Sequence, residues 1–526
     1  MKNKKQSIIL LILMLLIVAA IVLFACISGI GYNIKNKLNR IFMSGSHSIS
    51  LTQDEMLSDF EEMFDIFTEN EYAYATGNDL CNIDFKEKEN IYRNRLSKAE
   101  NELEFFYCLQ AVSADIQSCH TTLAFPDSQL YSNYANATAV LSDSTVHKYI
   151  DDWENLMYDF IDSYEPGPVW FDYCDGKYVI LRNSDNVIFE LESIDENNPD
   201  TFIKEELSAY KIKYDFVNQK AYRDSIVLDK NDGERKISLV MIGNNGERLE
   251  MEAFISYEAE LWSYYASSID DRAGSYVYND SQNNVSYVYV DSMIGDSSNL
   301  TAEIAGIPNE IENIIIDIRN NTGGLPEFAN DILYKPLFTE NSFAEGTIKI
   351  QKGTEGEKFY SSYLKINPIA NTFLRSENSS ELLFSTNTMY IGNASVKRDI
   401  YVLTANNTMS AADNFAAAVK NSGTAVIVGE NSGGEGLTIP PYITALNNSG
   451  LCLIVTASSA VNSQETDNVA YGTAPDIYSS HTIEGFGLKQ QLIANGKNPY
   501  TYENRLKWDN VLIETLEIIK EKGNVK

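Results

Sequence analysis

A serine that follows one predicted strand and opens a predicted helix is well placed to act as a nucleophile. Ile400 to Thr404 is apolar enough for a buried strand, and a short loop separates it from an alanine-rich segment that begins at Ser410. The first N–H groups of a helix lack partners and carry the positive end of its dipole, so they favour an anion. The pattern predicts nucleophilic chemistry at Ser410. The alternative is that Ser410 only caps the helix.

A second predicted strand ends in a turn that can supply further N–H donors. The run Ile314 to Arg319 has the β-branched composition of a fully buried strand, and it leads into Asn320 to Gly324. The paired glycines Gly323 and Gly324 permit a tight turn with exposed backbone N–H groups. The turn therefore either binds a developing negative charge or serves only to reverse the chain.

A nucleophilic serine needs a base, and histidine is the usual one because it titrates near neutral pH. The chain has four histidines: His47, His120, His147 and His481. His120 lies between a predicted helix and a predicted extended segment, directly after Cys119. A histidine rarely points at the preceding side chain, so Cys119 is a minor alternative nucleophile.

The start of the chain indicates where the protein works. Lys2, Lys4 and Lys5 precede an uncharged apolar run, residues 8–30. At about 1.5 Å per residue these residues span roughly 34 Å, enough for a hydrocarbon core of roughly 30 Å. We predict an uncleaved membrane anchor with its lysines in the cytoplasm and the rest of the chain outside the cell. A lipoprotein anchored at Cys26 is the alternative.

The charge of the outer part disfavours one class of partner. All 74 acidic residues lie beyond residue 40, but only 35 of the 41 Lys and Arg do, so the net charge there is 35 minus 74, or -39. This field repels phosphate backbones, so we expect no nucleic-acid partner. Cysteines 81, 108, 119, 174 and 452 have no recognisable disulfide or metal spacing, and the glycine loops do not form a nucleotide-binding motif.

Changes in the apolar pattern divide the chain into segments. Helical spacing extends to about residue 164, short β-like runs follow, and from Val285 strands alternate with helices. This alternation predicts an α/β core with a largely parallel sheet. Leu451 to Thr456 is one of its predicted strands, and the core ends in one predicted helix, around Arg505 to Lys520. The predicted segments are a cytoplasmic tail (1–7), a transmembrane helix (8–30), a linker (31–51), a helical unit carrying His120 (52–164), a β-rich module (165–275) and the α/β core (276–526).

Several motifs in this order resemble the tail-specific, or C-terminal-processing, serine peptidases. The strand with its glycine turn resembles the signature of that family, and Ser410 to Asp413 resembles its nucleophile segment. Three further segments are similar to parts of the family's sequence. Asp115 to Thr121 resembles its early Asp-x-His-Thr region, and Gly429 to Gly436 resembles the loop that follows the nucleophile segment. Gly472 to Asp476 resembles its closing Pro-Asp turn. Each motif alone is weakly specific, but five in the family's order are more so.

The resemblance implies a crotonase-like α/β peptidase core, a helical N-terminal unit and a PDZ-like middle module. It implies that Ser410 attacks the scissile carbonyl and that His120 is the general base. The N–H groups of Ala411 and of Gly323 or Gly324 would form the oxyanion hole. No cofactor or metal is expected.

One position indicates the branch of the family. The Ser-Lys branch carries a lysine base where this chain has Glu435, and a carboxylate cannot replace that ammonium. We therefore expect the Ser-His branch, which includes the tricorn core peptidase and the retinoid-binding-protein-like domains. That branch places an acid where this chain has Val469, so Glu465 and Asp467 are the predicted substitutes that orient His120. Either is alternatively a solvated loop charge.

The sequence therefore predicts a membrane-anchored extracellular serine peptidase that cuts peptides or unfolded protein segments. The alternative is an inactive family member that binds peptides or apolar ligands outside the cell. The geometry of Ser410 and His120, and the presence of an acid behind the histidine, distinguish these functions.

Overall fold

The core of the protein is a six-stranded sheet in which the run after Asn313 forms a central strand. The computed structural model describes residues 49–70, 75–127, 143–165, 167–266, 274–295, 297–366, 375–377, 380–462 and 464–525. In spatial order the strands are β10 (Tyr276–Asp280), β11 (Val285–Tyr289), β12 (Asn313–Asp317), β16 (Asp399–Thr404), β17 (Val426–Gly429) and β21 (Ile477–Tyr478). All neighbours pair in parallel except β10 and β11. The predicted mixed α/β core is confirmed.

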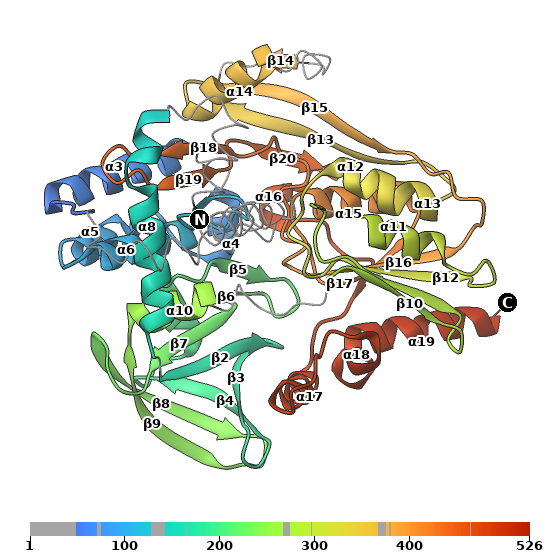
Figure 1. Ribbon diagram of the computed structural model, residues 1–526, viewed down its shortest axis with the longest axis horizontal. Coiled ribbons are helices and arrows are strands. Elements are labelled where there is room, and N and C mark those ends of the chain that lie inside the picture. Colours follow the sequence, from blue (N-terminus) through green and yellow to red (C-terminus); the bar gives the residue numbers. More distant parts are fainter. Residues whose placement is uncertain are drawn as a thin grey trace, which may run out of the picture.

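Helices cover both faces of this sheet (Figure 1). Ile314 and Ile316 of β12 pack in the same cluster as Phe415 of α15, whereas Ile315 packs with Leu512 of α19. Alternate residues of a strand point to opposite faces, so an uninterrupted apolar run is required when both faces are buried. The covering helices are α11 (Ser298–Ala305), α12 (Pro326–Phe328), the π-helix η3 (Ala329–Tyr334), α13 (Lys335–Leu337), α15 (Ala411–Ser422), α18 (Tyr502–Trp508) and α19 (Asn510–Val525). The helix α17 (Ile483–Ala494) instead packs its Phe486 against Cys174 and Val179 of the β-rich middle part.

The prediction of one helix from Arg505 to Lys520 is wrong, because the helix is interrupted at Asp509, between α18 and α19. Asp509 is buried and has a non-helical backbone, with φ -85° and ψ 84°. Its carboxylate accepts hydrogen bonds from Nη1 of Arg319 at 2.8 Å and from Nη1 of Arg505 at 3.0 Å. These contacts to a distant arginine outweigh the local helical pattern.

The N-terminal part is helical as predicted, and it donates a short strand to the rest of the protein. Thr52 and Glu55 form the expected capping box at the first helix. The strand β1 (Thr122–Leu123) pairs antiparallel with β19 (Cys452–Val455). The other elements of this part are the helices α3 (Gln53–Glu69), α4 (Ala75–Cys81), α5 (Glu89–Leu96), α6 (Glu102–Ala114) and α8 (Asp143–Ser163).

The strand predicted at Leu451 to Thr456 forms as β19, but it lies outside the parallel sheet. It is the middle strand of a separate sheet with β1 and β18 (Tyr442–Ala445). A further antiparallel sheet joins β14 (Arg375–Glu377), β15 (Glu381–Tyr390), β13 (Ser342–Gln351) and β20 (Ser459–Asn462), and α14 (Glu355–Ile366) connects β13 to β14. The long strands β13 and β15 extend along the top of the view in Figure 1.

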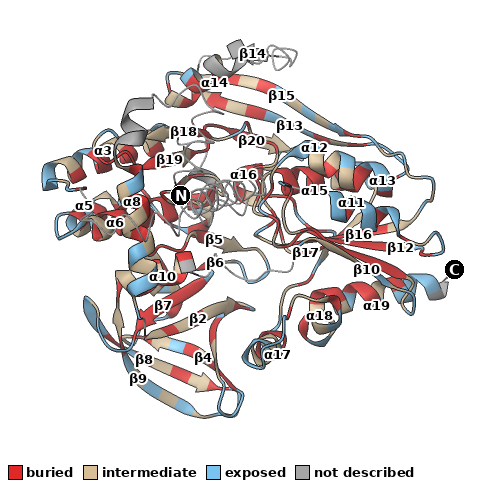
Figure 2. Cartoon of the chain, in the orientation of Figure 1, coloured by how far each residue is buried: buried red, intermediate tan, exposed pale blue. Residues whose placement is uncertain are grey.

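The β-rich middle of the chain forms a small closed barrel. Its strands follow the order β2 (Pro168–Cys174), β3 (Lys177–Arg182), β4 (Val187–Ile194), β8 (Arg235–Gly243), β9 (Arg248–Ile255) and β7 (Ser225–Asp229). The hairpin β5 (Ile212–Asp215) and β6 (Lys220–Arg223) extends from it, with α9 (Pro199–Glu205) and α10 (Tyr257–Ala266) alongside. Figure 2 shows exposed residues on the outer strands β8 and β9 and buried residues where the barrel meets the other parts.

The predicted anchor, residues 8–30, and Cys26 lie outside the described residues. Among the helices that the structure describes, none combines the length and the apolar character needed to span a bilayer. The anchor stays a prediction.

Candidate active site

Ser410 lies in a strained turn immediately before α15. Its backbone has φ 54° and ψ -123°, a region that non-glycine residues rarely adopt and that costs of order 1–3 kcal/mol. The N–H of Ser410 donates to the carbonyl of Gly434 at 2.9 Å, and its own carbonyl accepts from the N–H of Asn414 at 2.8 Å. Its side chain makes no capping hydrogen bond. The hydroxyl is therefore not used as a helix cap.

His120 lies in the loop between α6 and β1, and its side chain is 19% exposed. The pairing of Thr122 with Ile454 in β19 fixes the chain just beyond the histidine. Nδ1 of His120 lies 2.7 Å from Oε2 of Glu435. The histidine is therefore backed by an acid, and the acid comes from the loop that follows β17.

Glu435 is buried and has hydrogen bonds at both carboxylate oxygens. Oε1 accepts from Oγ of Ser118 at 2.7 Å and from the N–H of Cys119 at 2.5 Å, and Oε2 accepts from Oγ1 of Thr456 at 2.5 Å. Burial by itself would raise the pKa of Glu435, but the charge of His120 and these hydrogen bonds lower it to about 2. Glu435 is therefore an anion at neutral pH.

Asp413, in the first turn of α15, holds the loop that carries Glu435. Its carboxylate accepts hydrogen bonds from Oγ of Ser432 at 2.5 Å and from the N–H of Gly436 at 3.0 Å. It also accepts from Nδ2 of Asn468 at 2.8 Å and from Oγ1 of Thr473 at 2.6 Å. The Ser-Ala-Ala-Asp motif thus joins the nucleophile to the acid through a buried polar network.

The glycine turn lies directly against Ser410. A Cβ atom at Gly323, where φ is 104°, would lie 2.7 Å from Cβ of Ser410 and 3.0 Å from the nitrogen of Ala411. The N–H of Gly323 already donates to Oδ1 of Asn321 at 2.9 Å. Within the described part of the chain, the N–H groups of Gly324 and Ala411 have no acceptor. Gly324 and Ala411 therefore supply the free donors, and Gly323 supplies the space for the approach.

The two acids predicted from sequence do not contact His120 among the described residues. Glu465 is exposed in a turn before α16 (Asn468–Tyr471), where its φ is 61°. Asp467 caps that helix by accepting from the N–H of Val469 at 2.8 Å, and it also accepts from Oγ of Ser459. These local turn and cap contacts hold the two side chains away from the histidine. The sequence drew attention to Glu435 only as a replacement for a lysine.

Cys119, His120 and Glu435 form a group of possible metal ligands whose donor atoms lie within 4.8 Å of one another. Burial and the charge of Glu435 raise the pKa of the Cys119 thiol well above its ordinary value. A protonated thiol is a poor ligand and a poor nucleophile, and both oxygens of Glu435 already accept hydrogen bonds. These three residues therefore suit a histidine oriented by Glu435 better than they suit a metal site or a Cys119 nucleophile.

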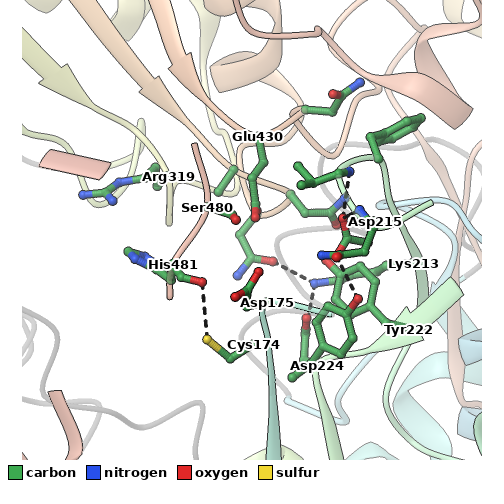
Figure 3. A pocket seen from close by; sticks show the side chains of 18 of the residues that line it. Cys174, Asp175, Lys213, Asp215, Tyr222, Asp224, Arg319, Glu430, Ser480 and His481 are labelled. Atoms are coloured by element: carbon green, nitrogen blue, oxygen red, sulfur yellow. Dashed lines mark hydrogen bonds and ion pairs between the residues drawn. The ribbon is translucent and has the colours of Figure 1, made fainter. Parts of the chain in front are cut away.

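A separate cavity of about 270 Å³ lies between the barrel and the core, on loops that adjoin this site (Figure 3). Nζ of Lys213 lies there between Oδ2 of Asp224, at 2.7 Å, and Oδ1 of Asn407, at 2.9 Å. Burial and the charge of Asp215 raise the pKa of Glu430, which also lines the cavity, to about 7. Neither Ser410 nor His120 lines this cavity.

The site has the parts of a serine hydrolase. A serine in a strained turn at a helix start, a histidine beside a buried carboxylate, and free N–H groups at a glycine turn together suit nucleophilic acyl transfer. These parts come from three regions that are far apart in the sequence and adjacent in the fold.

Residues 284–479 match the model of peptidase family S41. This segment is accordingly that of an S41 serine-type peptidase. The matched segment contains Ser410 and Glu435, whereas His120 lies before it.

Several solved structures resemble the chain at low sequence identity. Mature CPAF complexed with lactacystin is 14% identical, with a TM-score of 0.47, and the match covers 90% of this chain and 100% of that one. A putative peptidase from Parabacteroides merdae is 14% identical, with a TM-score of 0.41 and coverages of 88% and 96%. The photosystem II D1 C-terminal processing protease is 12% identical, with a TM-score of 0.32 and coverages of 82% and 93%. No curated protein matches the chain.

Proposed function

We propose that this protein is a membrane-anchored serine peptidase that cleaves peptide bonds outside the cell through an acyl-enzyme. The observation that carries the proposal is the 2.7 Å contact between Nδ1 of His120 and the buried carboxylate of Glu435. Since Glu435 is an anion, it favours the tautomer with the proton on Nδ1. The lone pair of Nε2 is then available to accept the proton of Ser410.

The proposed reaction has two steps. Oγ of Ser410 attacks the scissile carbonyl carbon while Nε2 of His120 takes the hydroxyl proton, and the same proton then passes to the leaving amine. A water molecule, deprotonated by His120, attacks the resulting ester and releases the acid product and Ser410. The N–H groups of Gly324 and Ala411 stabilise the oxyanion in both steps, and one such donor typically contributes about 3 kcal/mol.

The position of Glu435 supports the Ser-His branch of the family for this chain. Where the Ser-Lys branch has its lysine base, this chain has the carboxylate that backs His120. We extend the proposal to a crotonase-like core and a PDZ-like role for the barrel. Strand addition to the barrel would be restricted, since the closed barrel leaves few free strand edges.

The proposed location rests on the sequence before the described residues. The apolar length of residues 8–30 suits a single span, and the lysines before it suit the cytoplasm. The acidic outer part then faces the exterior, where peptides or unfolded protein segments are the proposed substrates. Attachment through Cys26 is the alternative.

A second candidate function is an inactive binder of peptides or apolar ligands. One observation favours it: Oγ of Ser410 has no hydrogen-bond partner among the described residues. Catalytic hydrogen bonds are often long before substrate binds, so a missing bond in the free protein is compatible with activity.

A fluorophosphonate probe tests the proposal on the full-length chain, because it reacts only with activated serines. We expect labelling of the native protein and its loss in both Ser410→Ala and His120→Ala. Ser422→Ala, which changes an exposed serine at the far end of α15, is the matched control and should label normally. A folded native chain that remains unlabelled would favour the binder.

A further inference from the structure

Lys211 lies directly before β5 and binds the loop that carries His120. Its Nζ donates to the carbonyl oxygen of Ser118 at 2.6 Å, to that of Thr121, and more weakly to that of Ile116 at 3.4 Å. One ammonium thus contacts three carbonyls of a single loop. These contacts cross from the strand region of the middle module to the helical part of the chain.

The contacts enclose His120 from both sides. Ile116 and Ser118 precede the histidine and Thr121 follows it, so Nζ closes the loop around the catalytic position. An ammonium has three donors and no acceptor, which matches three carbonyl oxygens. Lys211 forms no ion pair with any described carboxylate. Its charge is therefore directed at the loop backbone.

The same loop provides the donors that hold Glu435. Oγ of Ser118 and the N–H of Cys119 both donate to Oε1 of Glu435. Since Lys211 fixes the carbonyl of Ser118, a displacement of Lys211 would move these donors and the imidazole together. The lysine therefore controls the geometry of the acid and the base at once.

We propose that Lys211 is a positioning residue of this peptidase, whose ammonium holds loop 116–121 so that His120 faces Ser410. The inference rests on the proposed function. It adds a residue from the middle module to the control of a site whose reacting groups all lie elsewhere.

The charge of Lys211 gives the inference a readout in pH. Burial lowers the pKa of Lys211 to about 8, while Glu435 and Cys119 raise it and Lys213 on β5 lowers it further. Among the described residues, these three are the charged or titratable groups that act on the ammonium. Above pH 8 the amine loses its charge and one donor, so its hold on the carbonyls weakens.

The test measures how fast the full-length protein reacts with a fluorophosphonate probe between pH 6 and 10. For Lys211→Met we expect a maximal labelling rate about 100-fold lower, with the probe concentration for half-maximal rate unchanged, because a small displacement of a catalytic group has an effect of this size. Lys211→Arg keeps its charge, so we expect it to retain most of the rate at pH 7. The native enzyme should lose rate above pH 8, whereas Lys211→Arg should not.

Lys220→Met is the matched control. Lys220 lies on the same hairpin, but its ammonium pairs with Asp200 at 2.8 Å. The labelling rate and pH profile of Lys220→Met should therefore match those of the native protein. If Lys211→Met fails to show a cooperative thermal transition, Lys211→Arg decides the question. Labelling of a folded Lys211→Met within twofold of native, or a decline of Lys211→Arg above pH 8, would overturn this inference alone. An unlabelled native chain would instead overturn the proposed function and the inference with it.

Discussion

Two buried carboxylates stand on either side of the His120 loop, and they differ in the partners that neutralise them. Asp115, at the end of α6, lies 2.5 Å from Nζ of Lys88 and also pairs with Arg223 of the barrel hairpin. Glu435 lies 2.7 Å from Nδ1 of His120. Burial would raise both pKa values, yet neighbouring charge and hydrogen bonds lower both.

The difference shows how similar chemistry serves two purposes. Asp115 is neutralised by a lysine and an arginine, and its ion pair with Arg223 joins the helical part to the barrel hairpin. The partner of Glu435 is an imidazole, which can take a proton from a nucleophile and pass it on. Asp115 therefore anchors the loop, while Glu435 lies behind its proposed base, His120.

The largest expected effect comes from Glu435→Gln. An amide nitrogen would donate towards Nδ1 of His120, where the native chain has an anionic oxygen at 2.7 Å, so the wrong imidazole tautomer is favoured. We expect the labelling rate to fall by roughly 10⁴-fold, the usual cost of this change in a catalytic triad. Probe labelling measures this rate, and thermal unfolding should show that the variant is still folded.

Glu465→Gln is the comparison for that variant, because it makes the same chemical change on an exposed turn. Its labelling rate should equal that of the native chain. Equal losses in the two variants, or a normal rate in Glu435→Gln, would show that Glu435 does not orient His120.

Removing a partner of Asp115 should affect stability more than chemistry. Arg223→Met leaves the carboxylate with Lys88 alone among its charged partners, and losing one member of a buried ion pair typically costs about 3–5 kcal/mol. Urea unfolding should show this loss, while the labelling rate of the remaining folded protein falls less than tenfold.

The matched control is Arg235→Met, which removes two exposed ion pairs, with Asp195 at 3.1 Å and with Glu206. Each surface pair contributes about 0–1 kcal/mol, so the unfolding midpoint of Arg235→Met should change much less than that of Arg223→Met. If Arg223→Met kept its stability but lost activity as Glu435→Gln does, the distinction between an anchoring and an orienting carboxylate would fail.

The sequence predicted the parts of the site whose signals are local. The β-branched run of β12, the glycine turn and the alanine-rich start of α15 each leave a pattern within about ten residues, so the strand, the turn and the position of Ser410 were recognisable. The β-rich character of the barrel was also visible, although the closure of its strands was not.

Contacts between distant segments left no such pattern. Glu435 meets His120 only because β1 pairs with β19 and because Asp413 holds the loop at 432–436. The prediction chose Glu465 and Asp467 instead of Glu435, because these two carboxylates lie close in sequence to the position where the family has its acid. The antiparallel pairing of β13 with β15 and the interruption of the last helix at Asp509 were missed for the same reason, since both depend on partners far along the chain.

The smallest expected effect is a change of stability with pH that belongs to Glu435. Its pKa is about 2 in the folded protein against 4.5 as its ordinary value, so the carboxylate stabilises the fold above pH 4.5 and this contribution is lost as pH falls through 2. A difference of about 2.5 pKa units corresponds to about 3 kcal/mol.

Urea unfolding of the native chain and of Glu435→Gln at pH 7, 5, 4 and 3 measures this contribution to stability. Asp115 loses its own contribution in both proteins, so the native chain should lose stability relative to Glu435→Gln as the medium becomes acidic. A constant difference in the free energy of unfolding across this range would mean that Glu435 is not held as an anion by its partners, and its contrast with Asp115 would then rest on position alone.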